Sequence, residues 1–120
     1  MTETQGILTS PNIYVYHKIR KWNRLSILKN GLKTSIGDSY GHVSRKRNNE
    51  AIPAIFVNNT DGHDEGYCKQ HDFDIFRINT QIIDNEWFID EYMEARNSKY
   101  LVTFKDIPTH AIELIHCGKF

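Results

Sequence analysis

Residues 13–32, IYVYHKIRKWNRLSILKNGL, contain the change of hydrophobic period that decides the expected fold. The β-branched and aromatic run at residues 13–16 is typical of a strand, which we expect to end at His17. Apolar residues then recur at helical spacing, and Gly31 supplies the left-handed conformation that commonly ends a helix. The sequence therefore predicts a strand followed by a short amphipathic helix.

Shorter patterns indicate the remaining elements. Residues 33–50 are polar and rich in Ser and Asn, which predicts a long loop. A second helix is expected from the helical spacing of residues 87–95, with Asp84 or Asn85 as its cap and its end near Asn97. Further strands are expected at residues 52–57, 73–79, 100–104 and 111–116. Because helices follow only some of the strands, this order favours an α+β fold over a doubly wound parallel sheet. We expect a split, largely antiparallel sheet with two or three helices.

The composition is that of one globular domain. With 120 residues the chain can bury one core, so we expect a polar N-terminal leader at residues 1–11 and a single domain at residues 12–120. Fifteen basic residues balance fifteen acidic ones, so any attraction to nucleic acid or to an anionic membrane has to be local. The sequence has two cysteines, no secretory signal and no membrane-length apolar stretch. We expect a cytoplasmic protein without a membrane partner.

Three segments, in this order, resemble a known family. They are Tyr16-His17 at the end of the first expected strand, the helix at residues 25–32 (LSILKNGL), and the turn and strand start at residues 106–112. Together they resemble the small ADP-ribosyltransferases, most closely the DNA-targeting ADP-ribosyltransferase toxins, and RNA 2′-phosphotransferases share the general fold. The resemblance implies an ADP-ribosyltransferase-like domain that holds NAD between the two halves of a split sheet.

The resemblance also indicates candidate cofactor-binding residues. It implies that His17 hydrogen-bonds the adenosine-side ribose of NAD, because a neutral imidazole can donate and accept at once. Tyr16 precedes it, Asn58 ends the second expected strand where the family places a residue that flanks the nicotinamide, and Tyr40 could stack on a base or on nicotinamide. The alternative is that His17 only ends a surface strand and that the aromatic residues pack in the core or at its rim.

Candidate catalytic residues follow from the charge of the reaction. Loss of nicotinamide leaves an oxocarbenium-like ribose, which a nearby carboxylate stabilises. Where the resemblance places the catalytic Glu, the chain has Tyr100, which can donate one hydrogen bond but is uncharged at neutral pH. Glu113 is the carboxylate we select instead, because it interrupts an apolar strand, although period-2 alternation explains its position equally well.

Three further residues include possible metal ligands. His63, Cys68 and His71 include a Cys-x-x-His pair of the kind that binds zinc. A structural zinc site needs four ligands, and a fourth would come only through the chance of tertiary folding. We therefore expect no metal site.

Two functions of different classes follow from the sequence. The first is an NAD-dependent ADP-ribosyltransferase that modifies a protein or nucleic-acid target, as a phage or toxin-type effector would. Its partners would be NAD and a macromolecular acceptor. The second is a non-catalytic nucleotide- or protein-binding module with a transferase-like fold, which the Tyr at position 100 favours.

Overall fold

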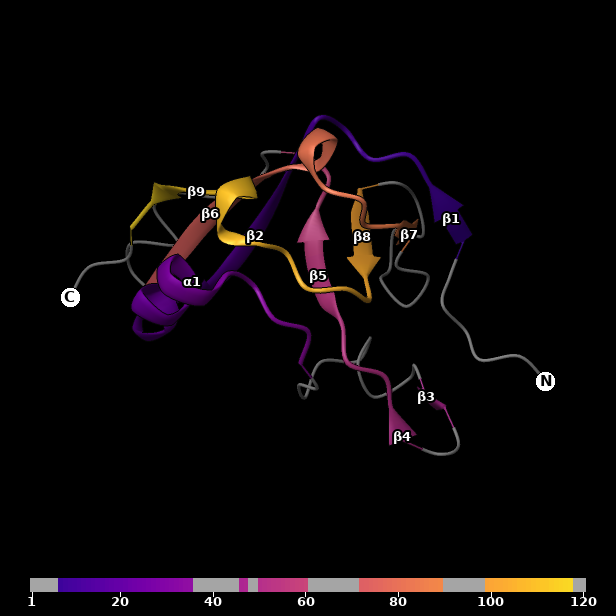
Figure 1. Ribbon diagram of the computed structural model, residues 1–120, viewed down its shortest axis with the longest axis horizontal. Helices are drawn as coiled ribbons and strands as arrows, with labels where there is room; N and C mark the ends of the chain where they lie inside the picture. Colours follow the sequence, from indigo (N-terminus) through magenta and orange to yellow (C-terminus); the bar gives the residue numbers. More distant parts are fainter. Residues whose placement is uncertain (1–6, 36–45, 48–49, 61–71, 90–98, 118–120) are drawn as a thin grey trace.

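The computed structural model describes residues 7–35, 46–47, 50–60, 72–89 and 99–117 of the chain (Figure 1). The main element of the described residues is one seven-stranded sheet, in which every described pair of strands is antiparallel. In spatial order the strands are β1 (Ile7–Thr9), β7 (Trp87–Ile89), β8 (Tyr100–Thr103), β5 (Ile55–Asn58), β2 (Tyr14–Arg20), β6 (Phe73–Asn79) and β9 (Ile112–His116). A separate two-stranded pair joins β3 (Lys46–Arg47) to β4 (Glu50–Ala51).

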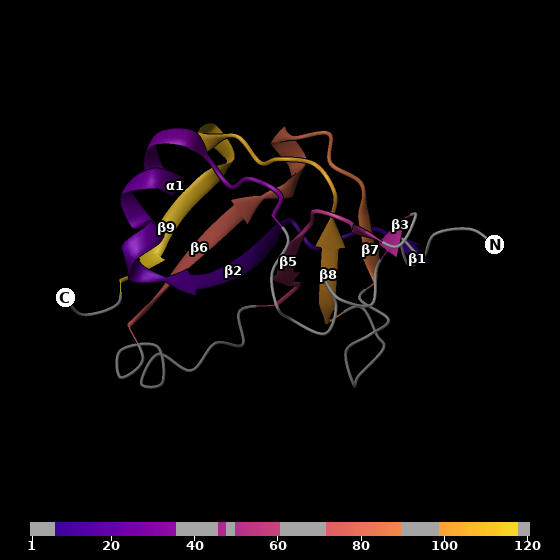
Figure 2. The same ribbon diagram turned by 90° about the horizontal axis from the view of Figure 1, so that it is seen from below.

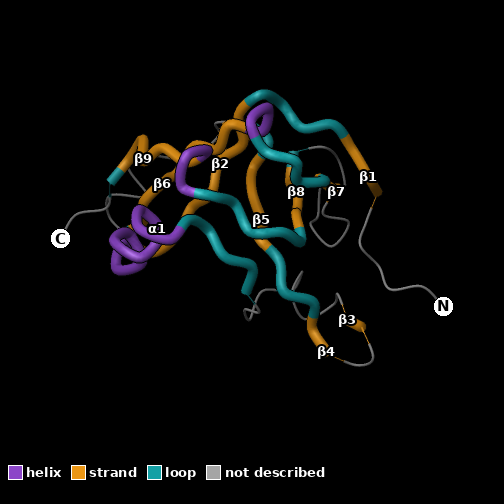
Figure 3. The backbone as a smooth tube through the Cα atoms, viewed as in Figure 1, coloured by secondary structure: helices purple, strands orange, loops and turns teal. Residues whose placement is uncertain are grey.

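Helical structure is sparse in the described residues, as Figure 3 shows. They contain a single α-helix, α1 (Arg24–Asn30), and three 3-10 turns. The turns are η1 (Lys21–Asn23), η2 (Thr80–Ile82) and η3 (Thr109–Ala111). The expected α+β fold with two or three helices is therefore wrong, and the chain is mostly antiparallel sheet.

The main difference from the expected fold is at residues 87–95, where the sequence predicts a second helix. Residues 87–89 form strand β7 instead, and residues 90–95 lie outside the described part of the chain. Trp87, Phe88 and Ile89 are aromatic or β-branched, and β7 is held between β1 and β8, so pairing on both sides overrides the helical spacing. Strand β1 likewise lies within the segment expected to be a polar leader.

The larger core cluster lies on the face of the sheet that α1 covers (Figure 2), and a smaller one around Phe88 and Val102 lies on the opposite face. Val15 of β2 and Phe76 and Ile78 of β6 are fully buried and form one cluster with Ile27 of α1. Ile27 is the buried residue of a seven-residue helix that is too short to be stable by itself, so this packing holds the helix in place. Because side chains alternate along a strand, the neighbours of these core residues face the opposite side of the sheet.

Two further contacts fix α1 at its ends. At the start, Arg24 donates two hydrogen bonds to Asp74 of β6, Nε to Oδ2 at 2.8 Å and Nη2 to Oδ1 at 2.7 Å. At the end, Gly31 has a φ of 81°, the positive value that the sequence predicts for the residue that ends this helix. Leu32 then exchanges two backbone hydrogen bonds with Ile107.

The sheet has a weak seam between β2 and β5. Tyr16 and Asn58 form the single residue pair between these strands. On one side of the pair, Asn12 donates its backbone N–H to Asn59 Oδ1 at 2.8 Å and its side-chain amide to Asn59 O at 2.9 Å. On the other side, the His17 ring donates from Nδ1 to the Phe56 carbonyl at 2.7 Å. At this seam, hydrogen bonds that involve side chains thus take the place of regular backbone hydrogen bonds between β2 and β5.

Candidate functional site

The register of the sheet aligns five side chains across five neighbouring strands. Tyr100 pairs with Asn58, Asn58 with Tyr16, Tyr16 with Arg77, and Arg77 with Glu113. Residues directly opposite each other in antiparallel strands share a face of the sheet, about 5 Å apart. The five residues form what we call the polar row, on the face opposite α1.

The polar row is accessible and carries both aromatic and charged groups. Tyr16, Asn58 and Tyr100 are half-buried, while the side chains of Arg77 and Glu113 are 36% and 60% exposed. Arg77 donates from Nη2 to Glu113 Oε1. The row therefore offers aromatic rings, an amide and a guanidinium whose carboxylate partner stands at the outer end.

The Arg77 guanidinium is also stacked on a ring of the neighbouring strand. Its central carbon lies 4.4 Å from the centroid of Tyr14, which is on the same face of β2 as Tyr16. A guanidinium over an aromatic face is held in place by the ring quadrupole. This contact fixes the Arg77 head group beside Tyr16.

A second group, which we call the basic strip, continues this face along β2 and β6. The Arg20 guanidinium carbon lies 4.6 Å from the ring centroid of Phe73 and 5.4 Å from that of Trp22. Lys18 Nζ lies 5.1 Å from the same Phe73 ring. Trp22 is 64% exposed. The basic strip is thus Lys18, Arg20, Trp22 and Phe73, with alternating cations and rings.

The structure brings together three of the six residues that the sequence analysis selected. Tyr16, Asn58 and Tyr100 are consecutive members of the polar row. The fourth, Glu113, is at the far end of the row and forms an ion pair with Arg77. Tyr40 lies outside the described residues.

His17 stands apart from this group. It follows Tyr16 within β2, so its side chain points to the face that α1 covers. There its ring donates to the Phe56 carbonyl and supports the seam between β2 and β5. It lies in the middle of β2 rather than at its end, and the described contacts give it a place in the sheet seam rather than in the polar row.

The two candidate catalytic residues are far apart. Tyr100 is in β8 and Glu113 in β9, with β5, β2 and β6 between them. Four strand spacings amount to about 19 Å. A single reacting atom cannot contact both side chains in this arrangement, so the two residues do not form one catalytic pair.

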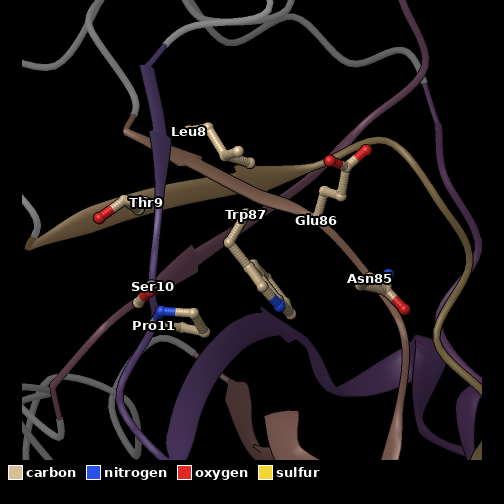
Figure 4. A pocket seen from close by; sticks show the side chains of 7 residues that line it. All are labelled: Leu8, Thr9, Ser10, Pro11, Asn85, Glu86 and Trp87. Carbon is tan, nitrogen blue, oxygen red and sulfur yellow. The ribbon is translucent and has the colours of Figure 1, made fainter.

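Two cavities lie elsewhere on the molecule. The first, about 710 Å³, lies between residues 8–11 and residues 85–87 (Figure 4). The second, about 580 Å³, lies beside η2 and η3 and is lined in part by Asp84, Lys105 and Asp106. None of the described candidate residues lines either cavity.

Two carboxylates at the second cavity have altered acidity. The pKa of Asp106 is lowered chiefly by the backbone N–H of Thr34, which donates to Oδ1 at 2.8 Å, with a further contribution from Lys33. The pKa of Asp84 is lowered by its hydrogen bond from Lys105. Both groups are charged at neutral pH and engaged with neighbouring donors, so each is explained as a structural contact at the cavity rim.

Neither a metal-binding group in the described residues nor a known relative indicates a function. No group of three His, Cys, Asp or Glu side chains suited to a metal occurs among the described residues, and His63, Cys68 and His71 lie outside them. No protein-family model matches the chain, and no curated protein is similar enough to count as a relative. In the described part of the chain, no helix has the length and apolarity needed to cross a membrane.

Sequence reasoning missed Arg77 and the basic strip, although a signal for part of them exists. Tyr14, Tyr16, Lys18, Arg20 and Trp22 occur at every second position, so aromatic and basic side chains repeat with the period of a strand. Ending the expected strand at His17 hid this repeat. The pairing of Tyr16 with Arg77 has no such signal, because it depends on the register between strands that are distant in the sequence.

Proposed function

We propose that the chain is a non-catalytic nucleotide-binding module whose binding site is the polar row. The observation that carries the proposal is the register that places Tyr16 beside Arg77 on one side and Asn58 on the other. A base can stack on a tyrosine ring, an amide can bond to the edge of adenine, and a guanidinium can bind phosphate in bidentate fashion. All three groups are neighbours on one accessible face.

Glu113 has a defined part in this proposal. Its carboxylate occupies Arg77 in the absence of a ligand, so a nucleotide phosphate has to compete with it. The pair is exposed, and exposed ion pairs contribute about 0.2–1 kcal/mol. Removing the charge of Glu113 therefore favours nucleotide binding by up to about fivefold.

NAD-dependent ADP-ribosyl transfer to a macromolecular acceptor is the second candidate function, and the position of Glu113 is the observation that favours it. The carboxylate is on the same face as Tyr16, one strand beyond Arg77. A phosphate that displaced it from Arg77 would leave it close to the bound ligand. In this case Glu113 would stabilise the ribose cation, and its loss would abolish turnover.

Calorimetric titration with AMP and with NAD tests the proposal. We expect Arg77→Ala and Tyr16→Leu to weaken AMP binding by about tenfold each, since a charge-assisted hydrogen bond or a stacked base is worth on the order of 1.5 kcal/mol. Lys29→Ala and Leu28→Ala are matched controls, because they remove a cation and an exposed apolar side chain from α1 on the opposite face. Wild-type protein that binds neither nucleotide would refute the proposal.

Glu113→Gln separates the two candidate functions. A binding module should bind AMP more tightly with this substitution and should release no nicotinamide from NAD in either form. A transferase should release nicotinamide as the wild type and lose that activity as the variant. Unchanged AMP affinity in Glu113→Gln would show that the phosphate does not bind at Arg77.

A further inference from the structure

We infer that the basic strip extends the nucleotide site, so that this face of β2 and β6 binds single-stranded RNA. The inference rests on the proposed nucleotide binding at the polar row and extends the ligand from one nucleotide to several. Its starting observation is that the strip and the row lie on the same face of the same two strands. Between residues 14 and 20, β2 spans about 20 Å, enough for a short single strand rather than one nucleotide.

Aromatic groups lie at both ends of this face. Trp22 and Phe73 flank the Arg20 guanidinium at one end, and Tyr14 and Tyr16 lie beside Arg77 at the other. Sheet-based RNA-binding domains stack two or three bases on aromatic side chains of this kind, and arginine planes also stack on bases. Trp22, the most distant ring from the polar row, is well exposed.

The charges of this face complement a polynucleotide backbone. On β2 and β6 the charged side chains that share the face are Lys18, Arg20 and Arg77, and all three are basic. Asp74, the single acid of these two strands, points to the α1 side and is paired with Arg24. Glu113 of β9 shares this face and is paired with Arg77, so the surplus of positive charge comes from Lys18 and Arg20. The chain as a whole has no net charge, so this is a local cationic surface rather than part of a general one.

RNA, rather than DNA, fits the polar groups beside Arg77, at the end of the face away from Arg20. Tyr14 and Asn79 are directly opposite each other at the polar-row end of the strip. The Tyr14 hydroxyl can donate and accept, as a 2′-hydroxyl can, and Asn79, whose Oδ1 accepts the Gln81 N–H at 3.0 Å, retains its amide donors. The 2′-hydroxyl is what distinguishes RNA from DNA at a protein surface. We therefore expect single-stranded RNA to bind more tightly than single-stranded DNA of the same sequence.

Binding of AMP, the hexanucleotide rA6 and its deoxy form dA6 tests the inference. We expect rA6 to bind at least tenfold more tightly than AMP and more tightly than dA6. Trp22→Ala and Arg20→Ala should each weaken rA6 binding about fivefold or more and leave AMP affinity unchanged, because they lie outside the polar row. Lys29→Ala on the opposite face should change neither affinity. Trp22 fluorescence should be quenched by rA6, with Trp22→Phe, which retains only buried Trp87, as the reference.

The outcomes separate this inference from the proposed function. AMP binding with no gain for rA6, or rA6 binding that Trp22→Ala and Arg20→Ala leave intact, overturns the inference while the nucleotide module stands. Equal affinity for rA6 and dA6 overturns the assignment to RNA. Binding of rA6 that is lost in Trp22→Ala, without any affinity for AMP, supports the inference and refutes the mononucleotide function.

Discussion

Gly31 is a position where both backbone conformation and packing exclude a side chain. Its φ of 81° with ψ of −176° falls in a region that is essentially open to glycine alone. A Cβ there would lie 2.3 Å from the carbonyl oxygen of Ile107. That oxygen accepts the Leu32 N–H at 2.9 Å, so it cannot withdraw without loss of the bond.

We therefore expect Gly31→Ala to lower the free energy of unfolding by about 2 kcal/mol or more. Urea denaturation of the two proteins measures the difference. Ser26→Ala, at an exposed position of α1, is the control and should stay within about 0.5 kcal/mol of the wild type. A Gly31→Ala protein as stable as this control would contradict the prediction.

Asp106 provides a pH-dependent contribution to stability. Its pKa is lowered in the folded state by the Thr34 N–H and by Lys33. A lowered folded pKa means that the stabilisation is present above the unfolded pKa, near 3.8, and is lost as the pH falls through the lower folded value. The side chain is about half exposed, so the contribution is below about 1 kcal/mol.

Asp106→Ala should accordingly destabilise the protein at pH 7, and the difference from the wild type should shrink as the pH falls below 3.8. Urea titrations at pH 7, 5 and 3 measure it. Asp84→Ala is the comparison, since Asp84 bonds a flexible lysine side chain rather than the backbone of another segment. A difference that is the same at all three pH values would contradict the role of the ionised carboxylate.

At the scale of elements, α1 is held to the sheet by one buried ion pair. Asp74 is fully buried and receives two hydrogen bonds from Arg24, which raise the pKa of that guanidinium. A raised folded pKa contributes stability that is fully present below the unfolded pKa and is lost only as the pH rises through the folded one, so the contribution of Arg24 persists at every working pH. Removing one partner of such a pair leaves a buried charge without its counter-charge.

We expect Arg24→Ala to cost about 3 kcal/mol, because breaking a buried pair typically costs 3–5 kcal/mol. Arg24→Lys should recover only part of this lost stability, since an ammonium cannot bond both Asp74 oxygens in the same plane. Lys21→Ala is the matched control: it breaks the more exposed pair with Asp72 and should cost less than about 1 kcal/mol. Chemical denaturation measures all three, and equal losses for Arg24→Ala and Lys21→Ala would contradict the prediction.

The elements differ in how far the sequence predicts them. Strand β6 has the bounds expected for residues 73–79, because its apolar residues and turn neighbours confine it. The helix before Gly31 was also predicted, since spacing and end signal agree. Strand β7 was missed because three residues cannot display a period, and its conformation comes from pairing with β1 and β8.

The candidate site shows the same limit within one strand. Tyr16 and His17 were assigned together, yet neighbouring residues of a strand point to opposite faces, so only one of them could lie in the site. Tyr16, Asn58 and Tyr100 do lie together, but on a register that the sequence does not display. Arg77 joins them for the same non-local reason.

At the scale of the whole molecule, the strand order places the polar row at the structural centre. Strand β2 lies between β5 and β6, and the row crosses it at Tyr16, beside the seam that side chains from Asn12, His17 and Asn59 support. A ligand on the row thus contacts strands on both sides of the weakest junction in the sheet. Ligand binding should therefore raise the free energy of unfolding of the whole domain.

The last prediction follows from this placement. A ligand that binds only the folded chain stabilises it by about 2.7 kcal/mol at a concentration of one hundred times its Kd, which for a domain of this size raises the Tm by roughly 10 °C. We expect AMP to produce such a shift in the wild type and in Lys29→Ala, a larger one in Glu113→Gln at the same AMP concentration, and about half of the wild-type shift in Arg77→Ala, whose affinity is about tenfold lower. Thermal unfolding followed by circular dichroism measures the four proteins. If the shift in Arg77→Ala equals that of the wild type, the ligand binds away from the row. In that case the register that places Tyr16 beside Arg77 would be a feature of the sheet alone.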